Sequence, residues 1–316
     1  MDFIYNGQKD PVALKNIIGD TIKKLIEEDP KVVYLDCDVM NCINTGKLPE
    51  TTDRAIQCGI SEANMIGVAC GMSAVGFKPL AHSFGPFVSR RVFDQVFLSG
   101  GYAGLSITVL GADPGVTAGF NGGTHMPFED MALYRAIPGA VVADITDGAM
   151  LKALFKLFLN TKGVKYIRTS RKEFYPVYPD NYEFKIGQGA VLREGKDLTI
   201  VACGIMVHEA LEAAKALSAS GIEAAVIDPI TVKPLDAELV RRYTEKTGAL
   251  ITAENHNRIG GLTSAVQDAV CGLPCKFGCV AVDDCFGEVG AIPYLQERFG
   301  LTAEHIVSVA KELLGK

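Results

Sequence analysis

Residues 59–67 read Gly-Ile-Ser-Glu-Ala-Asn-Met-Ile-Gly, and the rest of the chain is best understood from this segment. It places one carboxylate, Glu62, at the start of a helix of small residues expected from about Ser61 to Val75. Glutamate is almost never fully buried unless it is paired, and the flanking segments have the composition of buried elements. The positive end of a helix also stabilises a nearby negative charge. Glu62 is therefore either a helix-capping acid or a carboxyl group kept to exchange a proton.

Helical and strand patterns alternate on both sides of this segment. Apolar spacing indicates a first helix that includes Leu14 and Ile26, and a helix is expected over Val88–Leu98. Short apolar runs predict strands at 32–35, 79–81, 105–110, 141–145, 164–168, 198–202, 224–227, 250–253 and 280–282. Strands separated by helices pair in parallel, with helices on both faces of the sheet.

The alternation lapses between Lys172 and Lys185, where prolines and turn residues predict an interdomain connection. The fold class expected is thus α/β, with two consecutive α/β domains at residues 1–180 and 187–316. Each domain should contain a largely parallel sheet flanked by helices.

Composition narrows the functional classes. The chain has 316 residues, is 48% hydrophobic and carries a net charge of −6, which offers no electrostatic footprint for nucleic acid or an anionic membrane. No apolar run approaches the roughly 20 residues of a membrane span, and the N-terminus lacks the order of a signal peptide. Nine cysteines, an odd number, fit a reducing compartment. The sequence predicts a cytoplasmic protein.

The cysteines do not predict a metal site. Cys271, Cys275 and Cys279 recur every fourth residue, but Gly272 and Pro274 interrupt any helix that would align them. Zinc-type two-residue spacing does not occur. We therefore expect no metal site built from this chain alone.

Two aromatic residues follow the Glu62 segment. Phe84 and Phe87 directly precede the expected helix over 88–98. Such rings are commonly core residues. If they face Glu62, they instead form an apolar slot that would hold a heteroaromatic ring by stacking.

A loop from Asp113 to His125 contains five Gly or Pro residues among thirteen, too many for a regular element. Flexible polar loops after the strands of a parallel sheet are where ligands bind. His125 is either a general acid/base or a surface histidine in a turn. Arg168 and Arg171 end a strand, and each is suited to grip an oxyanion or to form a structural ion pair.

Taken together, these motifs resemble the transketolase family of thiamine-diphosphate enzymes over nearly the whole chain. The resemblance implies that Glu62 hydrogen-bonds a pyrimidine nitrogen of the cofactor and helps to activate it, and that Phe84 and Phe87 hold the aminopyrimidine. The run Thr-His-Met-Pro at 124–127 matches a family motif that assigns His125 to catalysis and substrate binding. Ser170-Arg171 matches a pair whose arginine grips the phosphate of sugar substrates.

Four positions depart from the family pattern. Arg90 replaces an aromatic residue at the cofactor, Asp113 a histidine near the substrate phosphate, Asn121 an aspartate that recognises a substrate hydroxyl, and Cys42 a phosphate-binding serine. A carboxylate at position 113 would repel a phosphate. This departure implies a substrate other than an ordinary sugar phosphate, such as a sulfonated sugar.

One family motif is absent. The diphosphate is normally clamped through Mg²⁺ by a Gly-Asp-Gly motif and a later Asn, whereas residues 146–148 read only Thr-Asp-Gly. The resemblance therefore implies a split enzyme. An N-terminal transketolase subunit would supply the diphosphate-binding domain and Mg²⁺, and two copies of each chain would form an α2β2 assembly around a dimer of this chain.

The function implied is transfer of a two-carbon ketol unit from a ketose, phosphorylated or otherwise anionic, to an aldehyde. One alternative is the beta subunit of a 2-oxoacid dehydrogenase decarboxylating component, which shares the two-domain layout. A second alternative is a non-catalytic assembly module. The motif over 124–139 favours transketolase over the first, and the presence of Glu62, Phe84, Phe87 and His125 argues against the second.

Overall fold

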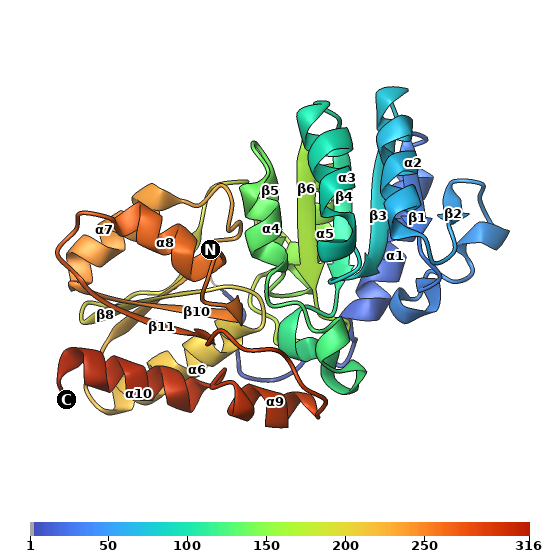
Figure 1. Cartoon of the computed structure of the whole chain (residues 1–316). Coiled ribbons are helices and arrows are strands. Elements are labelled where there is room, and N and C mark those ends of the chain that lie inside the picture. The colour runs from blue at the N-terminus through green and yellow to red at the C-terminus, as the bar shows by residue number, and fades with distance from the viewer. Residues whose placement is uncertain (1–2) are drawn as a thin grey trace.

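The first sheet of the computed structural model, which describes residues 3–316, has six strands that all pair in parallel (Figure 1). In sheet order they are β2 (Ala55–Gln57), β1 (Val32–Asp36), β3 (Lys78–Phe84), β4 (Ile107–Ala112), β6 (Val164–Thr169) and β5 (Val141–Asp144). The chain passes from β1 to β2 on one side and places β3 on the other. The strand order therefore reverses beside β1, and ligands of open α/β sheets bind at the carboxyl edge of such a reversal.

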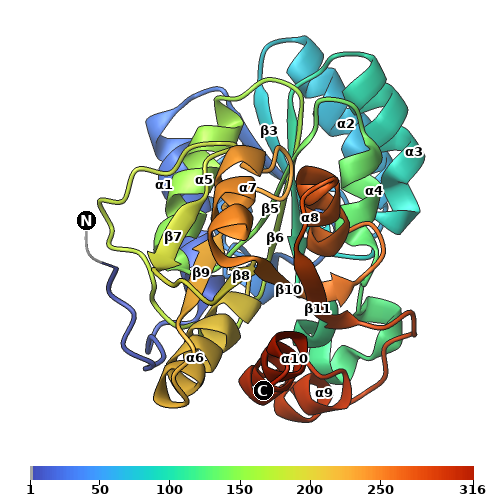
Figure 2. The same cartoon turned by 90° about the vertical axis from the view of Figure 1, so that its left-hand side faces the viewer.

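Helices cover both faces of this sheet (Figure 2). On one face lie α1 (Leu14–Glu28) and α5 (Gly148–Leu159), whose apolar residues share one core cluster. On the other lie α2 (Glu62–Ala74) and α4 (Asp130–Ala136). The α/β architecture predicted for this part of the chain is confirmed.

The helix expected over Val88–Leu98 differs in detail. A 3-10 turn over Arg90–Val92 leads into α3 (Phe93–Gln95), which continues as a π-helical segment, η4 (Val96–Tyr102). Ser89, whose hydroxyl donates to the Gly85 carbonyl at 2.7 Å, closes the tight turn before it. The segment between the aromatic pair and the helix is therefore a compact turn that carries two arginines.

The second sheet has five strands, of which only the edge strand β7 is antiparallel to its neighbour. In sheet order they are β11 (Lys276–Val282), β10 (Ala249–Asn257), β8 (Leu198–Ala202), β9 (Ala224–Asp228) and β7 (Ala190–Arg193). Figure 1 shows α7 (Ala237–Thr247) and α8 (Leu262–Val270) above this sheet, and α6 (Met206–Ala219) and α10 (Ala303–Leu314) below it. The helix α9 (Ile292–Arg298) instead contacts the segment Gly115–Asn121 of the first lobe.

The connection between the sheets, residues 170–189, contains no helix or strand. It is nevertheless packed, because the backbone N–H groups of Val177 and Tyr178 both donate to Asp147 and the Tyr178 hydroxyl donates to Asp228 of β9. Among residues 3–316, no helix combines the length and apolar character needed to cross a bilayer.

Candidate active site

The carboxyl edge of the first sheet brings together side chains from segments far apart in the sequence. Phe84 is the last residue of β3, Asp113 directly follows β4, and Arg171 lies just beyond β6. Glu62 begins α2, the helix that leads into β3. Parallel strands end at one edge of a sheet, so these residues converge on the place where a ligand is expected.

Glu62 is only 3% exposed, yet it is incompletely engaged. One carboxylate oxygen lies 2.8 Å from Nη1 of Arg91, and the other receives only a long contact, 3.4 Å, from the hydroxyl of Ser83. Because a buried carboxylate is costly without partners, Arg91 is the group that keeps Glu62 in place. The second oxygen is available to a ligand.

Three aromatic rings, those of Phe84, Phe87 and His125, pack together beside Arg91, the partner of Glu62. The rings of Phe84 and Phe87 lie 6.4 Å apart, and that of His125 lies 5.7 Å from Phe84 and 5.0 Å from Phe87, all close to perpendicular. The Arg91 guanidinium lies 4.2 Å from the centre of the Phe87 ring and so links the rings to Glu62. The three rings form an edge-to-face cluster that Arg91 joins to Glu62, and we call this cluster the aromatic slot.

The charge state of His125 follows from its surroundings. Burial lowers the pKa of His125 below its ordinary value of 6.5, and the positive charge of Arg91 lowers it further. Nδ1 lies 2.9 Å from the Thr124 hydroxyl. The imidazole is therefore neutral at pH 7 and can accept or donate one hydrogen bond to a substrate.

We expect an NMR titration of the five histidines of the chain to give His125 a pKa below 6.5. Replacement of Arg91 by methionine should raise that pKa, because a neighbouring positive charge disfavours the imidazolium form. The exposed Arg242, replaced by methionine, is the matched control and should leave it unchanged. A His125 pKa that is indifferent to Arg91 would contradict this electrostatic account.

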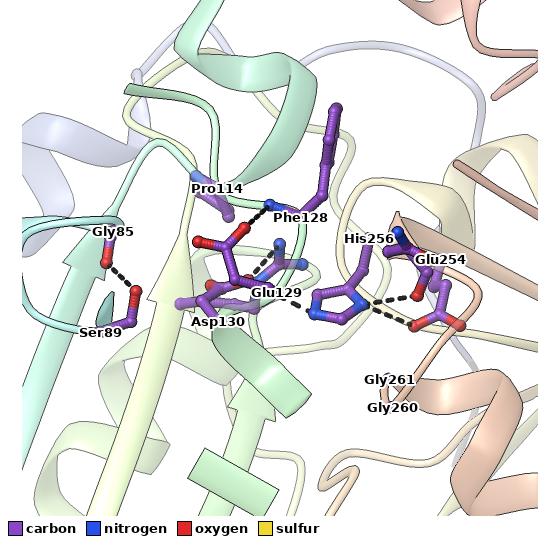
Figure 3. Close-up of polar contacts among 12 residues, drawn as sticks. Gly85, Ser89, Pro114, Phe128, Glu129, Asp130, Glu254, His256, Gly260 and Gly261 are labelled. Carbon is purple, nitrogen blue, oxygen red and sulfur yellow. Dashed lines mark hydrogen bonds and ion pairs between the residues drawn. The ribbon is translucent and has the colours of Figure 1, made fainter. Parts of the chain in front are cut away.

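Arg90, predicted at the cofactor, lies at the rim of the slot. Its Nε is 3.1 Å from Glu129, and Nη2 donates to the backbone carbonyl of Thr124 at 3.1 Å. Glu129 in turn accepts from the backbone N–H of Phe128 (Figure 3). These contacts hold the loop that carries His125 against the turn after Phe87.

Arg171, predicted to grip a phosphate, is engaged by Asp113. Oδ2 of Asp113 accepts from Nε at 2.8 Å and from Nη2 at 2.5 Å, and Oδ1 accepts from the Arg171 backbone N–H at 3.1 Å. Burial alone would lower the pKa of Arg171, but the bonds to Asp113 raise it above its ordinary value. Asp113 is therefore neutralised by an internal partner and is not a free repulsive charge.

A cavity of about 730 Å³ opens beside Arg171, between the two lobes. Its walls include Cys42, whose carbonyl accepts from Arg171 Nη1 at 3.3 Å, and residues Gly204 and His208 of the second lobe. Arg171 also lies 5.0 Å from the Phe84 ring. This arginine therefore separates the aromatic slot from the cavity. Asn121 is exposed at the end of the loop's 3-10 segment.

Arg168, the other candidate for an oxyanion, is a structural residue. It is fully buried, donates from Nε to Asp130 at 2.9 Å and from Nη1 to Asp144 at 2.7 Å, and reaches the Asn255 carbonyl of the second lobe at 3.0 Å. Figure 3 shows the adjoining cluster, in which His256 lies between Asp130 and Glu254, 3.8 Å from each. No ligand can reach a guanidinium enclosed in this way.

The sequence reasoning missed Arg91 as a site residue. Its contact with Glu62 spans 29 positions, and the two residues share no element. Only the pair of adjacent arginines after the aromatic motif hinted at it. Within residues 3–316, no group of three or more His, Cys, Asp or Glu side chains is placed to hold a metal ion.

Comparison with known proteins places these features in a family. Residues 10–176 match the transketolase pyrimidine binding domain, and residues 187–306 match the transketolase C-terminal domain. The chain is 47% identical over 304 residues to the 6-deoxy-6-sulfo-D-fructose transketolase subunit SqwH of Clostridium sp. (strain MSTE9), covering 95% of this chain and 94% of that protein.

Longer and solved relatives add to this picture. Human transketolase is 32% identical over 315 residues, which cover 97% of this chain but 50% of that protein. A solved structure described as a split gene transketolase, inactive beta4 tetramer, superposes with a TM-score of 0.88 at 36% identity and covers 97% of this chain and 99% of that one.

Proposed function

We propose that the aromatic slot and Glu62 are half of a thiamine-diphosphate site, because this chain belongs to the transketolase family. Within that family it is the C-terminal subunit of a split enzyme that transfers ketol units from a ketose to an aldehyde. We assign residues 1–180 to the pyrimidine-binding domain and 187–316 to the C-terminal domain. The observation that supports this proposal is the buried carboxylate of Glu62, which has one available oxygen near the rings of Phe84, Phe87 and His125.

The residues present fit the pyrimidine end of this cofactor. A flat heteroaromatic ring suits a slot walled by Phe84 and Phe87, and a ring nitrogen suits the available oxygen of Glu62. When bound, the cofactor supplies the electron sink that allows the carbon–carbon bond to break and re-form. Mg²⁺ needs oxygen ligands, and the Gly-Asp-Gly motif that supplies them in the family does not occur in this sequence, so the diphosphate and Mg²⁺ would be held by the partner.

The roles of this chain's residues follow from their positions. Glu62 would hydrogen-bond the ring nitrogen through its available oxygen and serve there as the group that passes a proton, while Arg91 keeps the carboxylate oriented. Phe84 and Phe87 exclude water from the ring faces. His125, neutral at pH 7, moves a proton at a substrate hydroxyl.

We further propose that the partner is an N-terminal transketolase subunit and that the active form is α2β2, built around a dimer of this chain. The relative described as a split gene transketolase forms an inactive tetramer of its beta chain, which supports the need for a second polypeptide. A chain of net charge −6 also has little to neutralise a diphosphate by itself.

Isothermal titration with thiamine diphosphate and Mg²⁺ tests this assignment. We expect weak or no binding by the chain alone, clear binding after the N-terminal subunit is added, and ketol transfer only in the mixture. Tight binding by the lone chain would refute a shared site. Binding without turnover in the mixture would instead favour the non-catalytic assembly module.

The substrate proposed is an anionic ketose with a sulfonate group. The relative at 47% identity acts, by its name, on 6-deoxy-6-sulfo-D-fructose, and Cys42, Asp113 and Asn121 depart from the usual pattern for sugar phosphates. The 2-oxoacid dehydrogenase alternative loses its support, because the chain is 47% identical to a transketolase subunit and 32% identical to human transketolase over 95% and 97% of its length.

A further inference from the structure

We infer that Asp113 is a specificity-determining residue that makes the anion site at Arg171 select a singly charged terminal group over a doubly charged one. This inference rests on the proposed function, since it assumes that the substrate enters between the aromatic slot and the cavity. It adds a mechanism of charge selection to that function.

Arg171 lies between the aromatic slot and the cavity. Its guanidinium lies 5.0 Å from the Phe84 ring on one side and lines the cavity of about 730 Å³ on the other. A ketose whose reacting end is held in the slot must therefore pass Arg171 before its far end enters the cavity. Arg171 is the cation that this far end meets first.

Partners within the chain already use most of the hydrogen-bonding capacity of Arg171. A guanidinium has five N–H donors, of which two go to Asp113 and one to the Cys42 carbonyl. The Nε–Nη2 edge, which would otherwise hold a phosphate with two parallel bonds, is occupied by Asp113. Two N–H groups remain for a ligand.

The side chains that line the cavity include more cations than acids. Four cations line it, namely Lys9, Lys15, Arg171 and Lys172, together with two acids, Glu173 and Glu209. Burial lowers the pKa of the lining His208 to about 4, so this histidine is neutral at pH 7.

Asp113, only 1% exposed, stands directly behind Arg171 and adds a third negative charge. Four cations against three carboxylates leave one net positive charge at the site. That charge matches a monoanion.

Sulfonates and phosphate monoesters differ in charge near pH 7. A sulfonate carries one negative charge at every physiological pH, whereas a phosphate monoester carries about −1.5 to −2 near pH 7 because its second pKa is about 6. Because Asp113 offsets the charge of Arg171, it removes attraction that an anion would otherwise feel, and this loss grows in proportion to the charge of the ligand. Asp113 therefore weakens the attraction of the phosphate about 1.5 to 2 times as strongly as that of the sulfonate.

The test uses the assembled two-subunit enzyme and compares kcat/KM for 6-deoxy-6-sulfofructose and fructose 6-phosphate. We expect the unaltered enzyme to prefer the sulfonate, and D113N to shift the ratio toward the phosphate by about ten- to a hundredfold. The exposed Asp53, replaced by asparagine, is the matched control and should leave the ratio unchanged.

A second measurement needs no variant. Between pH 7.5 and about pH 5.5 the phosphate ester becomes a monoanion, so the preference for the sulfonate should shrink as the pH falls, and shrink less in D113N. A preference for the phosphate, or a ratio that ignores both Asp113 and pH, would overturn the inference. No turnover of either ketose would count against the proposed function instead.

Discussion

Replacement of Glu62 by glutamine in the assembled enzyme is expected to lower kcat by about 10²- to 10⁴-fold, the usual contribution of a positioned proton-transfer group. Glutamine keeps the size of the side chain and its ability to contact Ser83 and Arg91, but it cannot exchange a proton. The loss should therefore appear in kcat with little change in the KM of the ketose. Steady-state kinetics of ketol transfer at saturating cofactor measure both quantities.

The matched control is Glu245 to glutamine on α7, an exposed acid far along the chain in the second lobe. It should leave kcat within about twofold of the unaltered enzyme, as expected for a surface substitution. Circular dichroism should show that E62Q folds normally. Near-normal turnover of a folded E62Q enzyme would remove the proton-handling role assigned to this carboxylate.

The fold was largely predictable from the sequence because its signals are local. Apolar runs of about five residues identified the buried strands, and the lapse near Lys172 identified the connection between the sheets. The edge strand β7 escaped notice because its three half-buried residues lack a clear apolar run. A helical segment does follow Phe87, but it runs from Arg90 to Tyr102 instead of Val88–Leu98, and it begins in a 3-10 turn and ends as a π-helix, which apolar spacing does not distinguish.

The site was predictable only in part, because its pairings are not local. The motifs predicted that Glu62 and His125 belong to one site, but the sequence did not show which residue each charged side chain pairs with. Asp113 and Arg171 are 58 positions apart, and each was judged alone, Asp113 as a repulsive acid and Arg171 as either an oxyanion-binding residue or a member of an unassigned ion pair. The structure shows that they pair with each other. Pairing across a sheet depends on strand order, which single motifs do not encode.

Arg168 also pairs with residues far away in the sequence, and its replacement has the largest expected effect on stability. Its replacement by methionine should lower the free energy of unfolding by about 3–5 kcal/mol, because it leaves buried carboxylates without their counter-charge. Burial alone would raise the pKa of Asp130, yet Arg168 and neighbouring groups hold it below its ordinary value. That carboxylate is charged in the folded protein and depends on Arg168.

Urea denaturation followed by circular dichroism and by tyrosine fluorescence measures this loss. The matched control is Lys24 to methionine, which breaks an exposed ion pair with Glu28 at 3.7 Å and should cost less than about 0.5 kcal/mol. Because Arg168 also binds the Asn255 carbonyl, the two probes should separate in R168M as the lobes unfold independently.

If R168M does not fold, a triple variant that adds D130N and D144N still decides the question. It removes the charges of Arg168 and of the two carboxylates that Arg168 contacts, and burying neutral groups costs less than burying an unpaired carboxylate. We therefore expect the triple variant to recover part of the lost stability. Equal unfolding midpoints for R168M and the Lys24 variant would instead show that this enclosed arginine contributes no more than a surface pair, and the role given to it at the contact between the lobes would fall.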